Sequence, residues 1–201
     1  MPAVIRPYHP SDLPSIYRIC LLTGEVGGDA TSLYRDPDLL SHLYAGPYPV
    51  ADPGLTFVAV DELGLVGYIV ATADTARFEQ WLEEAWWPTL RARYPLREDP
   101  RDGTEDHALV QRIHDWPRAD PALAERFPAH MHIDLLPRAQ GQGLGRQLVE
   151  TLSAALRERG VPGVHLGVDD RNQGAIAFYH RVGFTLGVQH QWGRTLTLDL
   201  S

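Results

Sequence analysis

Residues 130–146 read His-Met-His-Ile-Asp-Leu-Leu-Pro-Arg-Ala-Gln-Gly-Gln-Gly-Leu-Gly-Arg, and this stretch decides the fold. Its first half, 130–137, is typical of a strand. Its second half is a glycine-rich turn, after which leucines recur at every fourth position on one stripe of a helix. These are Leu144, Leu148, Leu152 and Leu156. Gly160 supplies a C-terminal stop, so the sequence predicts a strand, a glycine turn and a helix in direct succession.

The chain beyond this helix continues the sheet. Residues 163–168 form the next expected strand. Because a helix crosses between it and the strand at 130–137, the two strands are expected to be parallel, with a right-handed crossover. A short helix over 172–181 follows. Residues 184–188 and 194–200 are expected to close the domain as an antiparallel pair.

The N-terminal half supplies the remaining strands. We expect a short strand over 4–6, a helix over 11–24 and a second helix over 33–44. Residues 55–60 and 65–71 are β-type runs separated by four turn residues, which favours an antiparallel hairpin.

Residues 74–128 differ from the rest of the chain. They carry most of the tryptophans and many prolines, show no strand pattern and are helical near 77–93, so we interpret them as an insertion. No internal repeat or linker divides the chain, which predicts a single domain over 1–201. With 44% hydrophobic and 22% charged residues, the composition is that of an ordinary globular protein.

Charge and cysteine content exclude several classes of function. The formal net charge of −8 would repel a phosphate backbone, so nucleic acid is not an expected partner. Cys20 is the only cysteine, which excludes an intramolecular disulfide and favours the reducing cytoplasm. No window approaches the ~20 apolar residues of a membrane span, so no membrane association is expected.

The turn from Gln140 to Arg146 has the features of an anion site. Successive glycines let backbone N–H groups approach an anion, and the following helix adds its positive N-terminal end, so a diphosphate is the expected ligand. A dinucleotide-binding G-x-G-x-x-G starting at Gly141 would need glycine where Arg146 stands, and a P-loop would need Gly-Lys-Ser/Thr. The alternative interpretation is a tight strand-to-helix turn without a ligand.

The turn resembles that of the GNAT superfamily of N-acetyltransferases, Gln/Arg-x-x-Gly-x-Gly/Ala, at Gln140, Gly143 and Gly145. A later segment also resembles the superfamily, at Asn172, Ala175, Phe178, Tyr179, Gly183 and Phe184. The resemblance implies a GNAT fold of the mixed α/β (α+β) type. Its central sheet would be mostly antiparallel and flanked by helices, with the helical insertion between the third and fourth strands. Acetyl-CoA would be the cosubstrate.

A narrower resemblance covers most of the chain. Short segments are similar to the acetyltransferase-like domain at the C-terminus of animal O-GlcNAcases and to its free-standing bacterial relatives. They are Pro47-Tyr48, 67–70, 86–88, 93–95 and 132–137. The animal domain departs from the coenzyme-binding motif and is regarded as a pseudo-acetyltransferase, whereas this sequence keeps the motif. An acetyl-CoA-binding or protein-interaction module without turnover is therefore the alternative to an N-acetyltransferase.

The resemblance implies roles for individual residues. Backbone groups of Leu135 and Leu136 would contact the pantetheine arm, Asn172 would lie beside the coenzyme, and Tyr179 would lie near its sulfur. The amides that would hold the pyrophosphate belong to Gln140, Gly141, Gln142, Gly143, Leu144, Gly145 and Arg146. An amine attacks the thioester directly, and Tyr179 can protonate the leaving thiolate. Packing against the sheet is the alternative role of Tyr179.

An amine is mostly protonated at neutral pH, so a group should accept its proton. The candidates are His132 and Asp134, because strand alternation places them on one face together with His130. Asp169 and Asp170 are further candidates, and a purely structural role stays open for each of these residues.

The pattern His130-x-His132-x-Asp134, with His165 on the next strand, could also be read as a metal site, but we predict no metal because the glycine turn and Tyr179 would then be unexplained. The expected partners are acetyl-CoA and an unidentified amine, a small molecule or a peptide, and a homodimer is left open. Arginines in the insertion are candidates for an acidic acceptor group. They are Arg93, Arg97 and Arg101.

Overall fold

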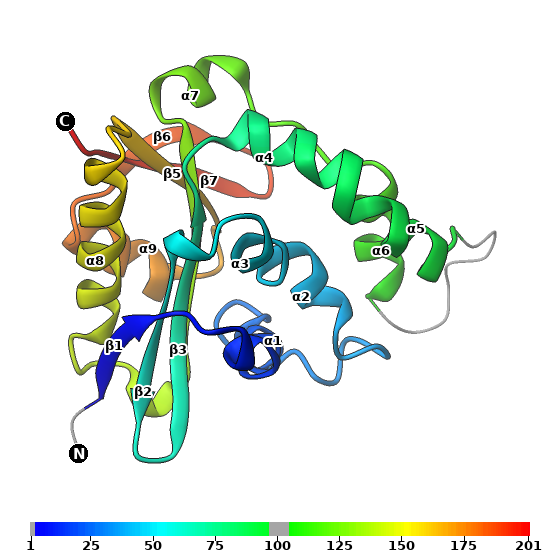
Figure 1. Ribbon diagram of the computed structural model, residues 1–201, viewed down its shortest axis with the longest axis horizontal. Coiled ribbons are helices and arrows are strands. Elements are labelled where there is room, and N and C mark those ends of the chain that lie inside the picture. Colours follow the sequence, from blue (N-terminus) through cyan, green and yellow to red (C-terminus); the bar gives the residue numbers. More distant parts are fainter. Residues whose placement is uncertain (1–2, 97–104) are drawn as a thin grey trace.

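The computed structural model describes residues 3–96 and 105–201, and its centre is one seven-stranded sheet (Figure 1). The strands are β1 (Val4–Pro7), β2 (Thr56–Asp61), β3 (Gly64–Thr72), β4 (Ala129–Leu135), β5 (Gly163–Asp169), β6 (Thr185–Gln189) and β7 (Gly193–Asp199). They lie in the order β1-β2-β3-β4-β5-β7-β6. Only the central neighbours β4 and β5 are parallel, so the sheet is mixed and mostly antiparallel, as predicted.

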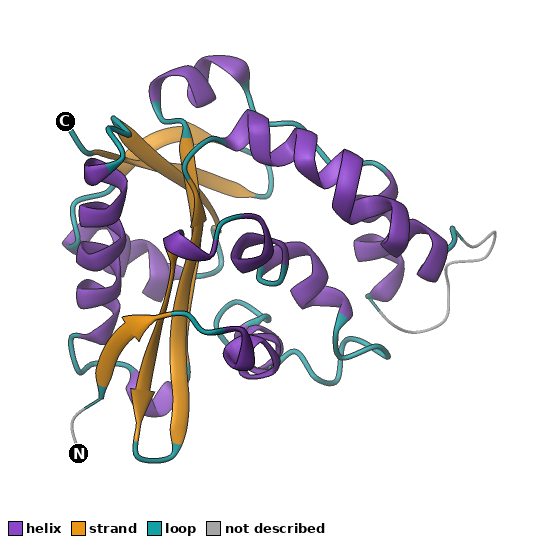
Figure 2. Ribbon diagram, viewed as in Figure 1, coloured by secondary structure: helices purple, strands orange, loops and turns teal. Residues whose placement is uncertain are grey.

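Helices cover both faces of the sheet (Figure 2). One face carries α8 (Leu144–Glu158) and α9 (Gln173–Arg181). The other face carries α1 (Leu13–Thr23), α2 (Leu39–Tyr44), α3 (Pro47–Ala51), α4 (Thr75–Trp81), α5 (Trp87–Arg93) and α6 (Asp106–His114), with α7 (Pro121–Arg126) leading into β4. A π-helical segment, Leu82–Trp86, joins α4 to α5. None of the helices in the described ranges is long and apolar enough to cross a membrane.

The sheet separates two hydrophobic cores because alternate strand residues point to opposite faces. In β3, Ile69 and Ala71 pack toward α8, whereas Tyr68 and Val70 pack toward α1 and α2. The leucine stripe predicted for α8 is buried as one row. It consists of Leu144, Leu148, Leu152 and Leu156.

Most elements agree with the sequence predictions, and the region between the first helix and the hairpin does not. The predicted helix over 33–44 begins only at Leu39, because residues 33–38 form turns in which the Asp36 carboxylate accepts the N–H of Asp38 at 2.9 Å. After α2, Gly46 precedes α3, which has Pro47 in its first turn, where a missing N–H has no cost.

The parallel pair at the centre of the sheet is short. Register partners join β4 to β5 only at Ala129–Val164 and His130–His165, near the N-terminal ends of both strands. Beyond these residues the strands diverge, although each remains paired with its other neighbour, β3 or β7. The divergence leaves the C-terminal half of β4, which leads through the glycine turn into α8, without a partner on the β5 side.

Gly67 allows the close approach of β3 and β4. A Cβ atom there would lie 2.3 Å from Leu135 Cδ2 and 2.8 Å from the backbone oxygen of Asp134. We predict that Gly67→Ala lowers the free energy of unfolding by roughly 1–3 kcal/mol, as over-packing does elsewhere, measured by urea denaturation. Gly174→Ala is the control, because its Cβ would meet nothing closer than 3.9 Å. Equal stability of both variants would contradict the packing account.

Candidate active site

A cavity of about 580 Å³ lies beside the C-terminal half of β4, where β5 no longer pairs with this strand. Its walls come from β4, the glycine turn, the first turn of α8, helix α9 and the loop after α1. The polar side chains that line it belong to Thr23, Asp134, Gln140, Arg146, Asn172, Tyr179 and Arg181. Segments far apart in the sequence therefore meet at this cavity. Most of the predicted site residues line it, but His132, Leu136, Gln142 and Leu144 do not.

Backbone groups of β4 face this cavity in alternation. Leu136 donates its N–H to the carbonyl of Val66 at 2.8 Å, on the β3 side. Because neighbouring residues of a strand direct their backbone groups to opposite edges, Ile133 and Leu135 turn theirs toward the cavity. Leu135 was among the predicted residues and lines the cavity, but Leu136 does not, and its N–H is already bonded. Ile133 was missed, although the period of two from Leu135 could have indicated it.

The glycine turn holds its amides open. Gly141 and Gly143 have φ angles of +73° and +79°, in the left-handed region that favours glycine. The first helical bond of α8 runs from Gln147 N–H to Gly143 C=O at 3.1 Å, and no side chain caps the helix. Within residues 3–96 and 105–201, the N–H groups of 141–146 have no acceptor. Together with the helix dipole, these donors favour an anion.

Two glutamine side chains of the turn donate hydrogen bonds to nearby backbone carbonyls. Gln140 donates from Nε2 to the Leu135 carbonyl at 3.0 Å, and Gln142 donates from Nε2 to the Arg138 carbonyl at 2.7 Å. Leu144 is buried in the core, so only its backbone is available to a ligand. Gly145 is buried against the Phe178 ring, and a Cβ there would lie 3.1 Å from that ring.

The far wall belongs to α9. Asn172 caps this helix, since its Oδ1 accepts the N–H of Ala175 at 3.0 Å, so it has a structural role besides the coenzyme contact predicted for it. The Arg146 guanidinium donates to the Arg181 carbonyl at 2.9 Å and thereby links α8 to α9 beside the cavity.

Tyr179 lines the cavity with a hydroxyl that has no hydrogen-bond partner among the described residues. The side chain is buried, and its ring packs 5.5 Å from that of Phe184, centroid to centroid. Burial, and then the charge of Asp134, raise the pKa of Tyr179 above its ordinary value. The hydroxyl therefore stays protonated at neutral pH and can donate a proton.

Asp134 also lines the cavity, and Tyr68 donates its hydroxyl to the carboxylate at 2.5 Å. Burial raises the pKa of Asp134, while hydrogen bonds from Tyr68 and Thr23 oppose the shift. A carboxylate whose pKa moves toward neutrality is a better proton acceptor than one at its ordinary value.

His132 lies two residues before Asp134 on the same face of β4, outside the walls of the cavity itself. Its Nε2 is 2.9 Å from the Tyr48 hydroxyl, and its ring lies 5.6 Å from that of Tyr44. Burial, followed by the nearby His165, lowers the pKa of His132 to about 4. The imidazole is therefore neutral at pH 7.

The two further aspartate candidates do not reach the cavity. Asp169 forms an ion pair with Arg171 at 2.8 Å, and Asp170 forms one with Arg194 at 2.7 Å. Neither lines the cavity. The sequence placed both correctly after β5, but it gave no sign of the arginine partners that hold them elsewhere.

The metal interpretation finds no support in the side-chain geometry. His130 contacts Tyr48 and Thr75 through its two ring nitrogens, and the Nδ1 of His165 contacts the Phe127 carbonyl. In the part of the chain that the structure describes, no group of three or more His, Cys, Asp or Glu side chains could hold a metal ion.

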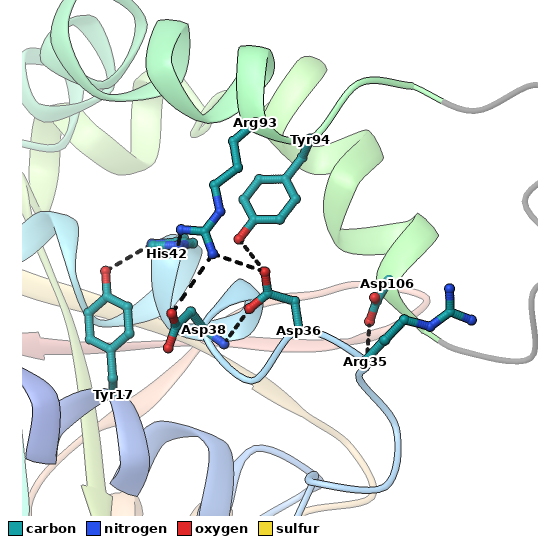
Figure 3. Close-up of polar contacts among 8 residues, drawn as sticks. All are labelled: Tyr17, Arg35, Asp36, Asp38, His42, Arg93, Tyr94 and Asp106. Atoms are coloured by element: carbon teal, nitrogen blue, oxygen red, sulfur yellow. Dashed lines mark hydrogen bonds and ion pairs between the residues drawn. The ribbon is translucent and has the colours of Figure 1, made fainter.

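The arginines of residues 74–128 were expected to meet an acidic acceptor. Arg93 instead pairs with Asp36 at 3.1 Å and Asp38 at 4.0 Å, in a polar cluster that joins α5 to the turn before α2 (Figure 3). Arg97 and Arg101 lie outside the described residues.

Comparisons with known proteins identify the family and the fold that the chain resembles. A family model described as Acetyltransferase (GNAT) family matches residues 29–184. The structure of SsHAT is 38% identical, has a TM-score of 0.90, and the match covers 100% of both chains. A putative acetyltransferase from Salmonella typhimurium, solved with its cofactor acetyl-CoA, has a TM-score of 0.56 at 18% identity over 100% of this chain and 95% of that chain, which shows a shared fold.

Protein O-GlcNAcase of Rattus norvegicus is 24% identical over 182 residues, which cover 89% of this chain and 20% of that protein. The chain therefore spans about a fifth of the length of the O-GlcNAcases that it matches. The similarity concerns one region of a much longer protein.

Asp134 should lower stability at neutral pH. Because its folded pKa is raised above the reference value of 3.8, ionisation opposes folding above the folded pKa, and this penalty disappears as pH falls toward 3.8. We predict that Asp134→Asn raises the Tm at pH 8 and that the gain shrinks toward acid pH, measured by calorimetry.

Asp12→Asn is the matched control with the opposite sign. The hydrogen bond from Arg6 lowers the pKa of Asp12, so this carboxylate stabilises the fold above 3.8, and the contribution is lost as pH falls through its folded pKa. A lower Tm for Asp134→Asn at pH 8 would contradict our assignment.

Proposed function

Since the chain belongs to the acetyltransferase (GNAT) family, we propose that it is an acetyl-CoA-dependent N-acetyltransferase that acts by direct attack of an amine in a ternary complex. The observation that carries this proposal is the cavity at the β4–β5 divergence, where free amides of the glycine turn and unpaired backbone groups of β4 meet one unbonded tyrosine hydroxyl.

The residues present fit the coenzyme. The amides of 141–146 suit a pyrophosphate, because backbone donors at a helix N-terminus favour anions. The N–H and C=O groups of Ile133 and the N–H of Leu135 suit the amide-containing pantetheine arm, which could continue the ladder that β5 leaves unfinished. When bound, acetyl-CoA supplies the acetyl thioester.

Three side chains of the protein would then move protons. The amine must lose a proton to become a nucleophile, and Asp134 and His132 are the acceptors within reach of that side of β4. Tyr179 would donate its proton toward the departing thiolate, since its hydroxyl is unbonded and its raised pKa keeps it protonated. No nucleophile of the protein is needed.

The alternative is a coenzyme-binding module without turnover, which the likeness to part of O-GlcNAcase supports. Release of free thiol from acetyl-CoA only on addition of an amine separates the two. The chain suits this assay, because its single thiol, Cys20, is buried and it contains no lysine that could be acetylated in place of the amine.

Binding of acetyl-CoA should raise the Tm, because a ligand at 100 times its Kd stabilises the folded state by about 2.7 kcal/mol. We predict that Gly143→Val abolishes this shift, since a β-branched residue resists a φ of +79° and displaces the amides. Gly160→Val is the control, because Gly160 has a φ of +70° at the far end of α8. A normal shift in Gly143→Val would place the coenzyme elsewhere, and shifts of equal size with NAD or ATP would indicate unselective anion binding.

Tyr179→Phe keeps the ring and removes the proton donor. We predict near-normal binding of acetyl-CoA and a fall in thiol release of at least about tenfold with any accepted amine, within the ~10² to 10⁴-fold that general-acid help typically supplies. Tyr94→Phe, which loses only its hydrogen bond to Asp36, should retain activity. Unchanged thiol release in Tyr179→Phe would exclude Tyr179 as the acid.

A further inference from the structure

A buried chain of hydrogen bonds leads from α4 through α3 to His132. Thr75 Oγ1 lies 2.8 Å from both the Pro128 carbonyl oxygen and His130 Nδ1. Tyr48 Oη then lies 2.9 Å from Nε2 of both His130 and His132. The chain connects α4, α3 and β4 on the face of the sheet opposite α8.

The carbonyl at one end determines the direction of every bond. A carbonyl can only accept, so the Thr75 hydroxyl must donate to Pro128 C=O, which also accepts the N–H of Thr75 at 2.8 Å. Because Thr75 donates its one hydroxyl proton to this carbonyl, Thr75 Oγ1 can only accept from His130. Nδ1 of His130 therefore carries a hydrogen.

Each histidine carries a single proton at neutral pH, because burial lowers the pKa of both His130 and His132. With its proton on Nδ1, His130 accepts at Nε2 from the Tyr48 hydroxyl. Because the Tyr48 hydroxyl donates its proton to His130, its oxygen accepts from Nε2–H of His132. The lone pair of His132 is left on Nδ1.

Nδ1 of His132 has no hydrogen-bond partner among residues 3–96 and 105–201. The fully buried side-chain N and O atoms that lack a partner in these residues are Thr56 Oγ1 and Trp87 Nε1, so Nδ1 of His132 is not fully buried. Asp134, on the same face of β4, adds a carboxylate. The Nδ1 lone pair lacks a donor, and the Asp134 carboxylate, which accepts from Tyr68 at Oδ2, can accept further hydrogen bonds. Acceptors of this kind suit a group that only donates, as a protonated primary amine does.

We propose that Thr75, His130 and Tyr48 are positioning residues that hold His132 as the Nε2–H tautomer, so that its Nδ1 accepts a hydrogen bond from the protonated amine of the acceptor. This inference deepens the proposed function and rests on it. The class of acceptor is a primary ammonium compound rather than an alcohol. If Nδ1 takes up the proton, the N–H bond of the ammonium breaks, its electron pair stays on nitrogen, and Nε2–H still donates to Tyr48.

Several charged or titratable groups surround His132 and bear on its titration. His130 and Asp134 share β4 with it, and His165 approaches from β5. Tyr48 comes from α3 and Tyr44 from α2. Behind the tyrosines, Arg112 of α6 donates to the Tyr44 hydroxyl at 2.9 Å, and Glu79 of α4 acts on Tyr48.

Nitrogen-15 NMR of histidine-labelled full-length protein tests the chain directly. We expect opposite tautomers, with the proton on Nδ1 in His130 and on Nε2 in His132. The resonances of the two histidines are assigned with the variants His130→Gln and His132→Gln. Tyr48→Phe keeps the ring stacked on Phe78 and should leave His132 as a mixture of tautomers. Thr75→Val should release His130 in the same way. Tyr17→Phe is the matched control, because it breaks a 2.9 Å bond to His42 outside the chain (Figure 3).

The second arm uses benzylamine as the probe and benzyl alcohol as its neutral counterpart, with coenzyme A present. Benzylamine, but not the alcohol, should shift the His132 Nδ1 resonance, and Tyr48→Phe should weaken benzylamine binding by roughly tenfold. A His132 protonated on Nδ1, or an Nδ1 indifferent to benzylamine, would overturn the proposal. Absence of an acetyl-CoA-induced Tm shift, with the tautomers as expected, would count against the proposed function and leave the chain of bonds standing.

Discussion

The short pairing of β4 with β5 is the constraint on which the site depends. Neighbouring parallel strands normally pair their backbone donors and acceptors with each other, but these two strands share register partners only at Ala129–Val164 and His130–His165. The divergence leaves the backbone of Ile133 and Leu135 turned toward a cavity instead of a neighbouring strand. The start of α8 adds amides that have no helical partner. Free backbone donors of β4 and of the helix N-terminus therefore lie at the same cavity.

The two faces of β4 carry different functional groups. Residues that suit a coenzyme lie at the strand edge and toward α8 and α9, whereas Asp134 and His132 lie on the opposite face with α1, α2 and α3. Polar groups on that face are buried, which raises the pKa of Asp134 and lowers that of His132. The charged form of each group opposes folding, at low pH for His132 and at higher pH for Asp134, and such a cost is consistent with a functional rather than a stabilising role.

Much of this arrangement follows from local sequence. The strand, glycine turn and helix over 130–160 are set by apolar periodicity and by glycine at two left-handed positions, and these predictions were confirmed. What sequence could not give depends on partners distant in the chain. Leu136 turns its N–H to Val66 of β3 rather than to the cavity, and Asp170 is held by Arg194, 24 residues away. Tyr48 and Thr75 carried no local sign of their contact with His130, although Tyr48 belonged to a family resemblance.

A structure of the protein bound to acetyl-CoA tests the central claim most directly. Our account predicts the pyrophosphate within hydrogen-bonding distance of the amides of 141–146, the pantetheine arm along Ile133 and Leu135, and the thioester between Tyr179 and Asp134. A coenzyme bound outside the β4–β5 divergence, or a β5 that closes onto β4 and excludes it, would contradict the account.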